Sequence, residues 1–560
     1  MKSILFRRLY GILVAALLLA GCSEDPAGSG GGAGGNSNDN GQLYEKKNMT
    51  IMGIVSCDGV GVADVAVSDG TNVTKTDAYG RYWLQSDISH HEFNFVHISI
   101  PSGYETVEQK GVAPAYWTTI DKAAEGVQRI DFALREVDQS NYTLLAIADS
   151  HVLGGHGRFQ SSNDRKQYNE VFMPRWKSYA EQCRTKGPVY GVHMGDMTQS
   201  EAWGKYTIAN FRDDTTCEVP LFCAMGNHDH DTPGSAKMTT FADETQYLSR
   251  KSYTAAMGPA YYSFNIGTEH YVVLDNTFIL TNNSGDYNCQ LDSRQLAWLR
   301  KDVAAINKNV IKGIVVVQHI PMYNANGKIA MVNGDRVMDI FKNYPVTFLI
   351  GHSHMDRSLK SQTPAGKPVW EFVHPSLAGT AWFTLKNTEG TPAAFCAYNF
   401  KDGVGTKRTY VPFGENEKLK YRIYSSVASV GISAAWDYAV TEKTGKRWSI
   451  ELDKEVASSS DRAAMLLNWW GAARIEFTGD GVSSMPGIYD LSYRDWYWPA
   501  LEAGNVGKYA NGEGASWQKP SKNSTHIWQY IPNTSGSAAV VVEGFDAYEN
   551  SLGRFMVTVK

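Results

Sequence analysis

Five short apolar segments of this chain each end beside residues that bind metal ions. The segments are rich in Val, Ile and Leu and are bounded by glycine and polar residues, which is typical of strands that are covered on both faces. They span residues 142–148, 188–194, 221–225, 311–318 and 346–350. Because the carboxyl ends of the strands in a layered α/β fold meet at one edge, we expect the residues that follow these segments to converge there.

The residues that follow the five segments include Asp, His and Asn side chains. They form the motifs Asp149-Ser150-His151, Gly195-Asp196, Gly226-Asn227-His228-Asp229, His319 and Gly351-His352-Ser353-His354. Asp and His bind divalent transition metals through oxygen and imidazole nitrogen. Hydrolytic sites often hold two metals about 3.5–4 Å apart, and Asp196 is the central candidate for the carboxylate that bridges them. Each motif alone is typical of an ordinary turn after a strand, so the prediction depends on all five together.

In this order the five motifs resemble those of the calcineurin-like metallophosphoesterase family, D-x-H, G-D, G-N-H-[D/E], H and G-H-x-H. The resemblance covers roughly residues 140–360. By position, it implies one metal held by Asp149, His151, Asp196 and His354. It implies a second metal held by Asp196, Asn227, His319 and His352. The implied catalytic residue is His228, which would protonate the leaving oxygen or stabilise the transition state.

The resemblance implies an α+β or α/β fold with a central β-sandwich flanked by helices. It also implies a phosphoesterase that hydrolyses phosphomonoesters or phosphodiesters by attack of a metal-bound hydroxide. Two divalent cations carry more positive charge than the carboxylates of Asp149 and Asp196 neutralise. The site would therefore be net positive, although the whole chain has a net charge of −5. Such a site favours an anionic substrate such as a phosphate ester. Mn, Fe and Zn all suit the ligands, and the substrate stays open. The composition carries no signal for nucleic-acid binding.

Two positions set the chain apart from known subfamilies. Gln199 stands where protein Ser/Thr phosphatases carry an Asp that orients the catalytic His, and where purple acid phosphatases carry a Tyr ligand. Purple acid phosphatases also have a Gly in the place of His151. The match is closer to the broad bacterial class of phosphomonoesterases and phosphodiesterases. If His228 has an orienting partner, the candidate is Asp229.

Several polar residues near the motifs have two interpretations. For His193, the sequence favours a hydrogen-bonded histidine in the core. His230 could touch substrate, and His156, Arg158 and Arg165 could grip phosphate, but a solvated surface loop is at least as good an interpretation for each. Six cysteines follow Cys22 without zinc-like spacing, and both pairing of Cys217 with Cys223 and buried thiols stay open.

The first 22 residues predict export and attachment to lipid. A positively charged start precedes the short apolar run 12–20, and Leu19-Ala20-Gly21-Cys22 resembles a lipobox. The run is too short to span a bilayer, which favours a secretory signal. We expect cleavage before Cys22, acylation of its thiol and anchoring at the cell envelope. Ser23, rather than an aspartate, follows the cysteine, which favours the outer membrane. An ordinary cleaved signal peptide is the alternative.

The rest of the chain divides into a tether and three domains. Residues 23–48 form a flexible tether, because Gly, Ser and Asn dominate it. Residues 49–137 read as a small β-sandwich and resemble modules at the front of exported proteins, with an expected role in spacing or interaction. The metallophosphoesterase domain is placed at 138–385, and a C-terminal β-rich domain at 386–560.

Within the central domain, further elements have recognisable patterns. Residues 292–306 predict an amphipathic helix with Asp292 as its N-cap. Residues 261–276 predict a pair of strands. Residues 229–260 and 277–291 are expected to form insertions near the metal edge that shape access to the site.

Aromatic residues give the C-terminal domain an alternative role. It contains eight tryptophans, Trp436, Trp448, Trp469, Trp470, Trp496, Trp498, Trp517 and Trp528. They favour a buried core or interface, with exposed sugar-stacking at 492–499 as the alternative. The rival interpretation of the whole protein is a surface lipoprotein that binds a glycan or other ligand and uses the metallophosphoesterase fold as a scaffold.

Overall fold

The computed structural model describes residues 41–87, 94–152, 163–199, 206–215, 218–231, 240–281, 285–379, 381–382, 385–387, 391–414, 417, 420–425, 465–479, 482–486, 488–490, 527–530 and 538–559. The chain divides into two units, Met1–Gln42 and Leu43–Lys560. The predicted signal peptide, Cys22 and most of the tether lie outside the described residues, as do His156, Arg158, Cys217 and the 492–499 stretch. In the described part, no helix combines the length and the apolar character needed to cross a membrane.

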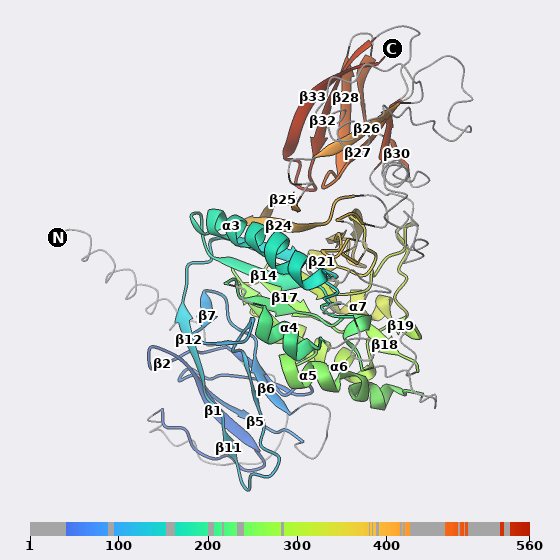
Figure 1. The fold of residues 1–560 in the computed structure, drawn as a ribbon. Coiled ribbons are helices and arrows are strands. Elements are labelled where there is room, and N and C mark those ends of the chain that lie inside the picture. The colour runs from blue at the N-terminus through green and yellow to red at the C-terminus, as the bar shows by residue number, and fades with distance from the viewer. Residues whose placement is uncertain are drawn as a thin grey trace, which may run out of the picture. The chain divides into compact units, whose positions relative to one another are not determined.

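Two β-sheets form the centre of the second unit (Figure 1). The first has the strand order β15-β14-β13-β24-β25. Its strands are β13 (Asn141–Ile147), β14 (Val189–His193), β15 (Leu221–Cys223), β24 (Ala394–Lys401) and β25 (Val404–Pro412). The second has the order β16-β17-β20-β21-β23-β22. Its strands are β16 (Tyr262–Ile266), β17 (Glu269–Val273), β20 (Gly313–Gln318), β21 (Val346–Ile350), β22 (Arg357–Gln362) and β23 (Pro368–Val373).

The side chains of β13 alternate between two hydrophobic cores. Leu144 and Ala146 point into the core that also contains side chains of the second sheet, such as Val315 on β20. Leu145 and Ile147 point to the opposite face, into a core with helical residues. The strand is therefore covered on both faces, as its continuous apolar run predicts.

Helices cover the outer face of each sheet. Those on the first sheet include α3 (Met173–Arg184), which lies along β14 in Figure 1, α4 (Ile208–Asp214) and α5 (Lys251–Met257). Those on the second are α6 (Ser293–Ala304) and α7 (Gly334–Phe341). The predicted N-cap is confirmed, because the Asp292 carboxylate accepts a hydrogen bond of 2.8 Å from Gln295 N. A β-sandwich flanked by helices is the predicted architecture, and it is confirmed.

Shorter elements complete the central domain. They are α2 (Asp164–Gln167), the π-helical turn η2 (Tyr168–Phe172), the 3₁₀ turns η3 (Asn227–Asp229) and η4 (Asp243–Arg250), β18 (Thr277–Ile279) and β19 (Tyr287–Cys289). The ring centroid of Tyr287 lies 6.0 Å from that of His352. The predicted insertion at 277–291 therefore reaches the edge where the predicted ligands lie.

The N-terminal domain is a small β-sandwich, as predicted. One sheet contains β11 (Gln128–Arg129), β1 (Ile51–Cys57), β12 (Phe132–Glu136) and β7 (Tyr104–Thr106), with β2 (Val60–Gly61) and β5 (Arg81–Leu84) paired to β1. The other contains β10 (Trp117–Thr119), β6 (Phe95–Ile98), β3 (Ala66–Ser68) and β4 (Val73–Lys75). A separate hairpin pairs β8 (Gln109–Lys110) with β9 (Ala113–Pro114).

The described part of the C-terminal domain holds two four-stranded sheets. One has the order β26 (Tyr421–Ser425), β27 (Met465–Trp469), β31 (Ile527–Tyr530) and β30 (Ile488–Asp490). The other has the order β29 (Val482–Pro486), β28 (Arg474–Gly479), β32 (Ala538–Phe545) and β33 (Ser551–Val559). Trp469, Trp470 and Trp528 are buried, which agrees with the core interpretation for these three. The other five C-terminal tryptophans lie outside the described residues.

The predicted domain boundary at residue 385 is wrong. β24 pairs antiparallel with β13, and β25 pairs with β24, so the central sheet continues to Pro412. Trp382 lies against the first motif, because its Nε1 donates to the Ser150 carbonyl at 2.8 Å. A strand sequence does not indicate which sheet it joins, because that pairing is a long-range contact.

Candidate metal centre

The five motifs meet at one edge of the sandwich. β13, β14 and β15 run parallel in the first sheet, and β20 and β21 run parallel in the second. The carboxyl ends of each set therefore point the same way. The first sheet supplies Asp149, His151, Asp196, Asn227 and His228, and the second supplies His319, His352 and His354.

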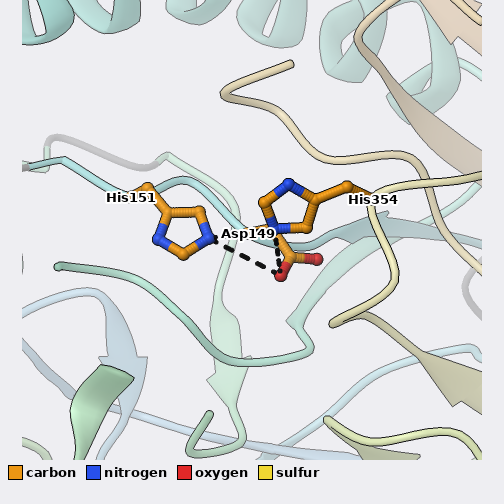
Figure 2. Close-up of side chains that lie close together, drawn as sticks. All are labelled: Asp149, His151 and His354. Carbon is orange, nitrogen blue, oxygen red and sulfur yellow. Dashed lines mark hydrogen bonds and ion pairs between the residues drawn. The ribbon is translucent and has the colours of Figure 1, made fainter. Parts of the chain in front are cut away.

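Asp149, His151 and His354 form a first cluster of possible metal-binding atoms. Both imidazoles are turned toward one carboxylate oxygen of Asp149 (Figure 2), with His354 Nε2 at 3.2 Å and His151 Nε2 at 3.8 Å. The two Nε2 atoms lie 3.0 Å apart. Asp196 joins this cluster, because its Oδ2 lies 3.6 Å from His151 Nε2.

Asp196, His319 and His352 form a second cluster. His319 Nε2 lies 3.2 Å from Asp196 Oδ2, the oxygen that also faces the first cluster. The Asn227 amide oxygen lies 3.1 Å from His319 Nε2 and 3.0 Å from His352 Nδ1. Asp196 thus stands between the two clusters, in the position that a bridging carboxylate needs.

The two ring nitrogens of His319 show whether the residues of the second cluster fit a cation. Its Nδ1 lies 2.7 Å from the Met194 carbonyl, so Nδ1 carries a proton and donates it there. In the neutral imidazole, Nε2 then has only a lone pair, and it faces the oxygens of Asp196 and Asn227, which are acceptors as well. Acceptors that face one another are stable only around a positive charge. The residues present therefore fit a divalent cation at this point.

The pKa values of His319, Asp196 and Asp149 also indicate that this site favours positive charge. Burial lowers the pKa of His319, but Asp196 outweighs burial and raises the pKa to about 9, so a proton fills the place without a metal. Burial raises the pKa of Asp196, yet His319 and His228 hold that pKa well below its usual range. In Asp149, burial is likewise outweighed, mainly by His354, which lowers the pKa to about 2. Both carboxylates are therefore ionised and available as ligands at neutral pH.

The backbone at this edge is strained. Asp149, His151, Asp196, His352 and His354 have positive φ angles of 53°, 39°, 54°, 67° and 50°. Residues other than glycine rarely adopt this left-handed conformation, and such strain gathers at functional sites where the surroundings enforce it. Here five of the eight predicted site residues share it, which indicates that the fold aims these side chains at a common point.

His228 borders the first cluster. A ring nitrogen of His228, a ring nitrogen of His151 and a carboxylate oxygen of Asp196 form a third possible metal-binding group. The ring centroid of His228 lies 5.1 Å from that of His151. Its backbone N donates to Asp196 Oδ1 at 2.8 Å. Burial lowers the pKa of His228. The imidazole is thus placed beside the two clusters, where it can reach a group bound between them.

Two family models match this chain. The model described as "N terminal of Calcineurin-like phosphoesterase" matches residues 49–137, and the model described as "Calcineurin-like phosphoesterase" matches residues 142–356. The chain belongs to the calcineurin-like phosphoesterase family.

Curated relatives of this chain include plant phosphatases. Purple acid phosphatase 13 of Arabidopsis thaliana is 27% identical over 37% of this chain and 37% of its own length. Purple acid phosphatase 15 of the same plant is 27% identical over 38% of this chain and 41% of its own. The chain thus spans about two fifths of these relatives. They belong to the subfamily from which Gln199 and His151 set this chain apart.

Solved structures are similar at lower identity. A dimetal phosphatase from Danio rerio is 14% identical, with 49% of this chain and 98% of that chain covered and a TM-score of 0.31. A 5'-nucleotidase precursor from Thermus thermophilus is 14% identical, with 49% and 54% covered and a TM-score of 0.24.

Asp229 holds backbone groups of the site and does not orient the ring of His228. Its Oδ1 accepts hydrogen bonds from the backbone N of Met197 and Thr198, and its Oδ2 accepts one from Gly226 N. The buried carboxylate therefore ties the loop that carries Asp196 to the loop that carries His228. The sequence suggested a catalytic partner because Asp229 adjoins His228, but neighbouring residues in a 3₁₀ turn point in different directions.

The interpretation of His193 as a core histidine is confirmed. Its Nδ1 accepts from Gly195 N at 3.2 Å, so its Nε2 carries the proton and donates to Ser150 Oγ at 2.9 Å. Ser150 Oγ in turn donates to the Met197 carbonyl. This chain of hydrogen bonds joins the first motif to the second.

Neither interpretation of His230 is right, because its side chain is buried, whereas Arg165 lies at the surface as its alternative interpretation predicts. His230 is buried, and its two ring nitrogens lie 3.0 Å from Ser249 Oγ and 3.2 Å from Asp275 Oδ1, so it does not face substrate. Arg165 forms an exposed ion pair of 2.8 Å with Asp214. Neither side chain contributes to the candidate site.

One supporting residue escaped the sequence analysis. Asn276 Oδ1 accepts hydrogen bonds from the backbone N of His319 and Ile320, and its Nδ2 donates to the Ile320 carbonyl. It thereby fixes the loop that carries His319. A signal for it existed, because residues 271–274 form an apolar run that is followed by Asp275-Asn276, much as polar residues follow the five motif segments.

Replacement of Gly226 by alanine is expected to destabilise the protein and to displace Asp196. A Cβ atom at this position would lie 2.2 Å from Asp196 Oδ1 and 2.4 Å from Asp196 N. Overpacking of this kind costs about 1–3 kcal/mol. Urea unfolding measures the effect. Gly285→Ala is the matched control, because a Cβ there would meet nothing within 4 Å, and a similar loss in both variants would contradict the prediction.

Replacement of Asp275 by asparagine is expected to lower the free energy of unfolding at pH 7 by about 3 kcal/mol or more. Burial raises the pKa of Asp275, but His230 and Arg250 outweigh it and hold that pKa far below its usual range. The stability that a depressed pKa provides is present above the unfolded value of about 3.9 and is lost as the pH falls.

The difference between wild type and Asp275→Asn should therefore be smaller at pH 3 than at pH 7, as measured by urea unfolding. Asp339→Asn is the control, since that carboxylate is exposed on α7. A difference independent of pH would argue against a charged Asp275.

Proposed function

We propose that this protein hydrolyses phosphate monoesters or diesters at a centre of two divalent cations. The observation that carries the proposal is the position of Asp196, whose Oδ2 faces His151 at 3.6 Å and His319 at 3.2 Å. One cation would be held by Asp149, His151, Asp196 and His354, and the other by Asp196, Asn227, His319 and His352. Such a pair would supply Lewis-acid stabilisation and a nucleophilic water at neutral pH.

The side chains of the protein have separable tasks in this reaction. The ligand set brings two carboxylates to four positive charges, so the loaded site attracts a phosphate group. His228 stands beside the first cluster, where it would donate a proton to the leaving oxygen or hydrogen-bond to the phosphoryl group. Asp229 and Asn276 hold the loops of the site through backbone hydrogen bonds.

Hydrolysis of p-nitrophenyl phosphate and bis-p-nitrophenyl phosphate tests this function. The fragment Leu43–Lys560 forms one compact unit and suits the assay. It would be stripped by chelation and reloaded with Mn, Fe or Zn, with Asn227→Ala alongside. Turnover that requires a cation and is lost in the variant supports the proposal, and the preferred substrate separates monoesterase from diesterase. A folded protein that holds two cations and hydrolyses neither would favour the ligand-binding alternative.

We also propose that the mature protein is anchored to the cell envelope by a lipid on Cys22. The lipobox Leu19-Ala20-Gly21-Cys22 and the glycine-rich stretch after it support this. Cys22→Ala is expected to move the protein from the membrane fraction to the soluble fraction and to abolish palmitate labelling. Labelling that persists in the variant would contradict the anchor.

A further inference from the structure

Asp356 links the last histidine motif to the C-terminal domain. It lies two residues after His354 and is fully buried. Its Oδ1 accepts a hydrogen bond of 2.5 Å from Arg408 Nη2 on β25, and its Oδ2 accepts one of 2.8 Å from Gly471 N. Gly471 belongs to the turn between β27 and β28 of the C-terminal domain. One carboxylate therefore receives a donor from each of two domains.

A second turn of the C-terminal domain holds Arg408 from the other side. The backbone N of Arg408 donates to Asp546 Oδ2 at 3.0 Å, in the turn between β32 and β33. In the same turn, Asn550 Nδ2 donates to the Thr406 carbonyl at 2.6 Å. Tyr548 packs against the core between the two central sheets. Two separate turns of the C-terminal domain thus hold Asp356 and Arg408.

The network continues from Arg408 to the start of the histidine motif. Arg408 Nε donates to Tyr398 Oη at 3.2 Å, and Tyr398 Oη lies 2.9 Å from His374 Nε2. His374 Nδ1 lies 3.0 Å from the Ile350 carbonyl and donates to it, so Nε2 accepts from the tyrosine hydroxyl. Ile350 ends β21 directly before Gly351.

One buried network of hydrogen bonds therefore holds the segment 351–356 at both ends, through Ile350 and Asp356. Between them lie His352 and His354, whose φ angles are 67° and 50°. Such conformations persist only where the surrounding structure over-determines them. Asp356 and Arg408 supply that constraint, and the C-terminal domain in turn supplies donors and acceptors to both.

We infer that the C-terminal domain positions the histidine motif: Gly471 and Asp546 hold Asp356 and Arg408, and these fix the segment that carries His352 and His354. The inference rests on the proposed function insofar as the two histidines bind a cation. Asp356 and Arg408 are positioning residues. Groups that orient metal ligands typically change metal affinity by about 10–100-fold when they are replaced.

The test uses the full chain with Asp356→Asn and Asp546→Ala. Calorimetry would measure the affinity for Mn²⁺ alone, and hydrogen exchange with mass spectrometry would follow residues 351–356 in the metal-free protein. We expect Mn²⁺ to bind about 10-fold more weakly or worse in both variants, and the segment to exchange faster. Arg408→Lys keeps the charge but loses donors, and serves as a milder variant if either of the others does not fold.

Two matched controls separate positioning from general destabilisation. Asp302→Asn replaces another buried carboxylate, on α6, which accepts from Ser263 Oγ at 2.7 Å and faces His270 Nε2 at 2.9 Å. Glu549→Ala alters the same turn as Asp546, but Glu549 pairs with Arg474. Both controls should keep Mn²⁺ affinity within about twofold of wild type.

The outcomes distinguish this inference from the proposed function. Unchanged exchange of 351–356 in Asp356→Asn and Asp546→Ala would overturn the inference, as would equal changes in the two controls. If the wild-type protein binds no Mn²⁺, the proposed function fails, and the exchange rates of 351–356 still decide whether the C-terminal domain holds the motif.

Discussion

Replacement of Asp196 by asparagine is expected to reduce phosphate-ester hydrolysis by about 10³-fold or more, since even one lost stabilising donor in an active site costs about 10²–10³-fold. Asp196 Oδ2 faces both clusters, and its Oδ1 accepts from His228 N. Loss of its charge therefore weakens both cation sites at once. Asparagine is the suitable replacement, because it removes the charge and tolerates the positive φ angle of 54° at this position.

Metal content and turnover are measured together for this variant. We expect fewer than two cations per chain after dialysis, alongside the loss of turnover. Asp339→Asn, on the exposed face of α7, should behave as wild type. An Asp196→Asn protein that retains two cations and full turnover would exclude Asp196 as the shared carboxylate.

Replacement of His228 by alanine is expected to lower kcat by about 10²–10⁴-fold, the range of general acid–base contributions, with the metal content unchanged. His228 lies beside the first cluster but outside the two proposed ligand sets. Its backbone N–H to Asp196 survives the substitution, so the ligand loops should keep their geometry.

The leaving group separates the two roles proposed for His228. A proton donor matters most when the leaving oxygen is basic, so alkyl phosphates should lose more activity than p-nitrophenyl phosphate. If His228 instead stabilises the phosphoryl group, both substrates should lose activity alike. A His228→Ala protein that loses a cation would contradict both roles and would make His228 a ligand, which its closeness to His151 and Asp196 allows geometrically.

Strand positions could be predicted from the sequence because a strand that is buried on both faces has a continuous run of apolar residues. The segment predicted at 346–350 coincides with β21, and that predicted at 142–148 differs from β13 by one residue at each end. Helix α6 could also be predicted, because its apolar spacing and its N-cap Asp292 lie within one stretch of chain. Patterns of this kind depend only on neighbours in sequence.

Predictions failed where a long-range contact decides the role of a residue. Asp229 was a candidate to orient His228, but it bonds to backbone groups some 30 positions earlier, at Met197 and Thr198. His230 was a candidate to touch substrate, but it is enclosed by Ser249 and Asp275. The boundary at residue 385 was wrong for the same reason, since β24 pairs with a strand some 250 residues earlier.

The sequence by itself determined the family of this protein and the side chains that it offers to cations, because the motifs that carry Asp, His and Asn after apolar strands are local and are spaced as the family requires. Only the tertiary structure decided that Asp196 stands between two clusters, that Asn276 and Asp229 hold the loops, and that Asp356 receives donors from two domains. The physical reason is that a residue's identity sets which bonds it can make, whereas its partners are set by how distant segments pack.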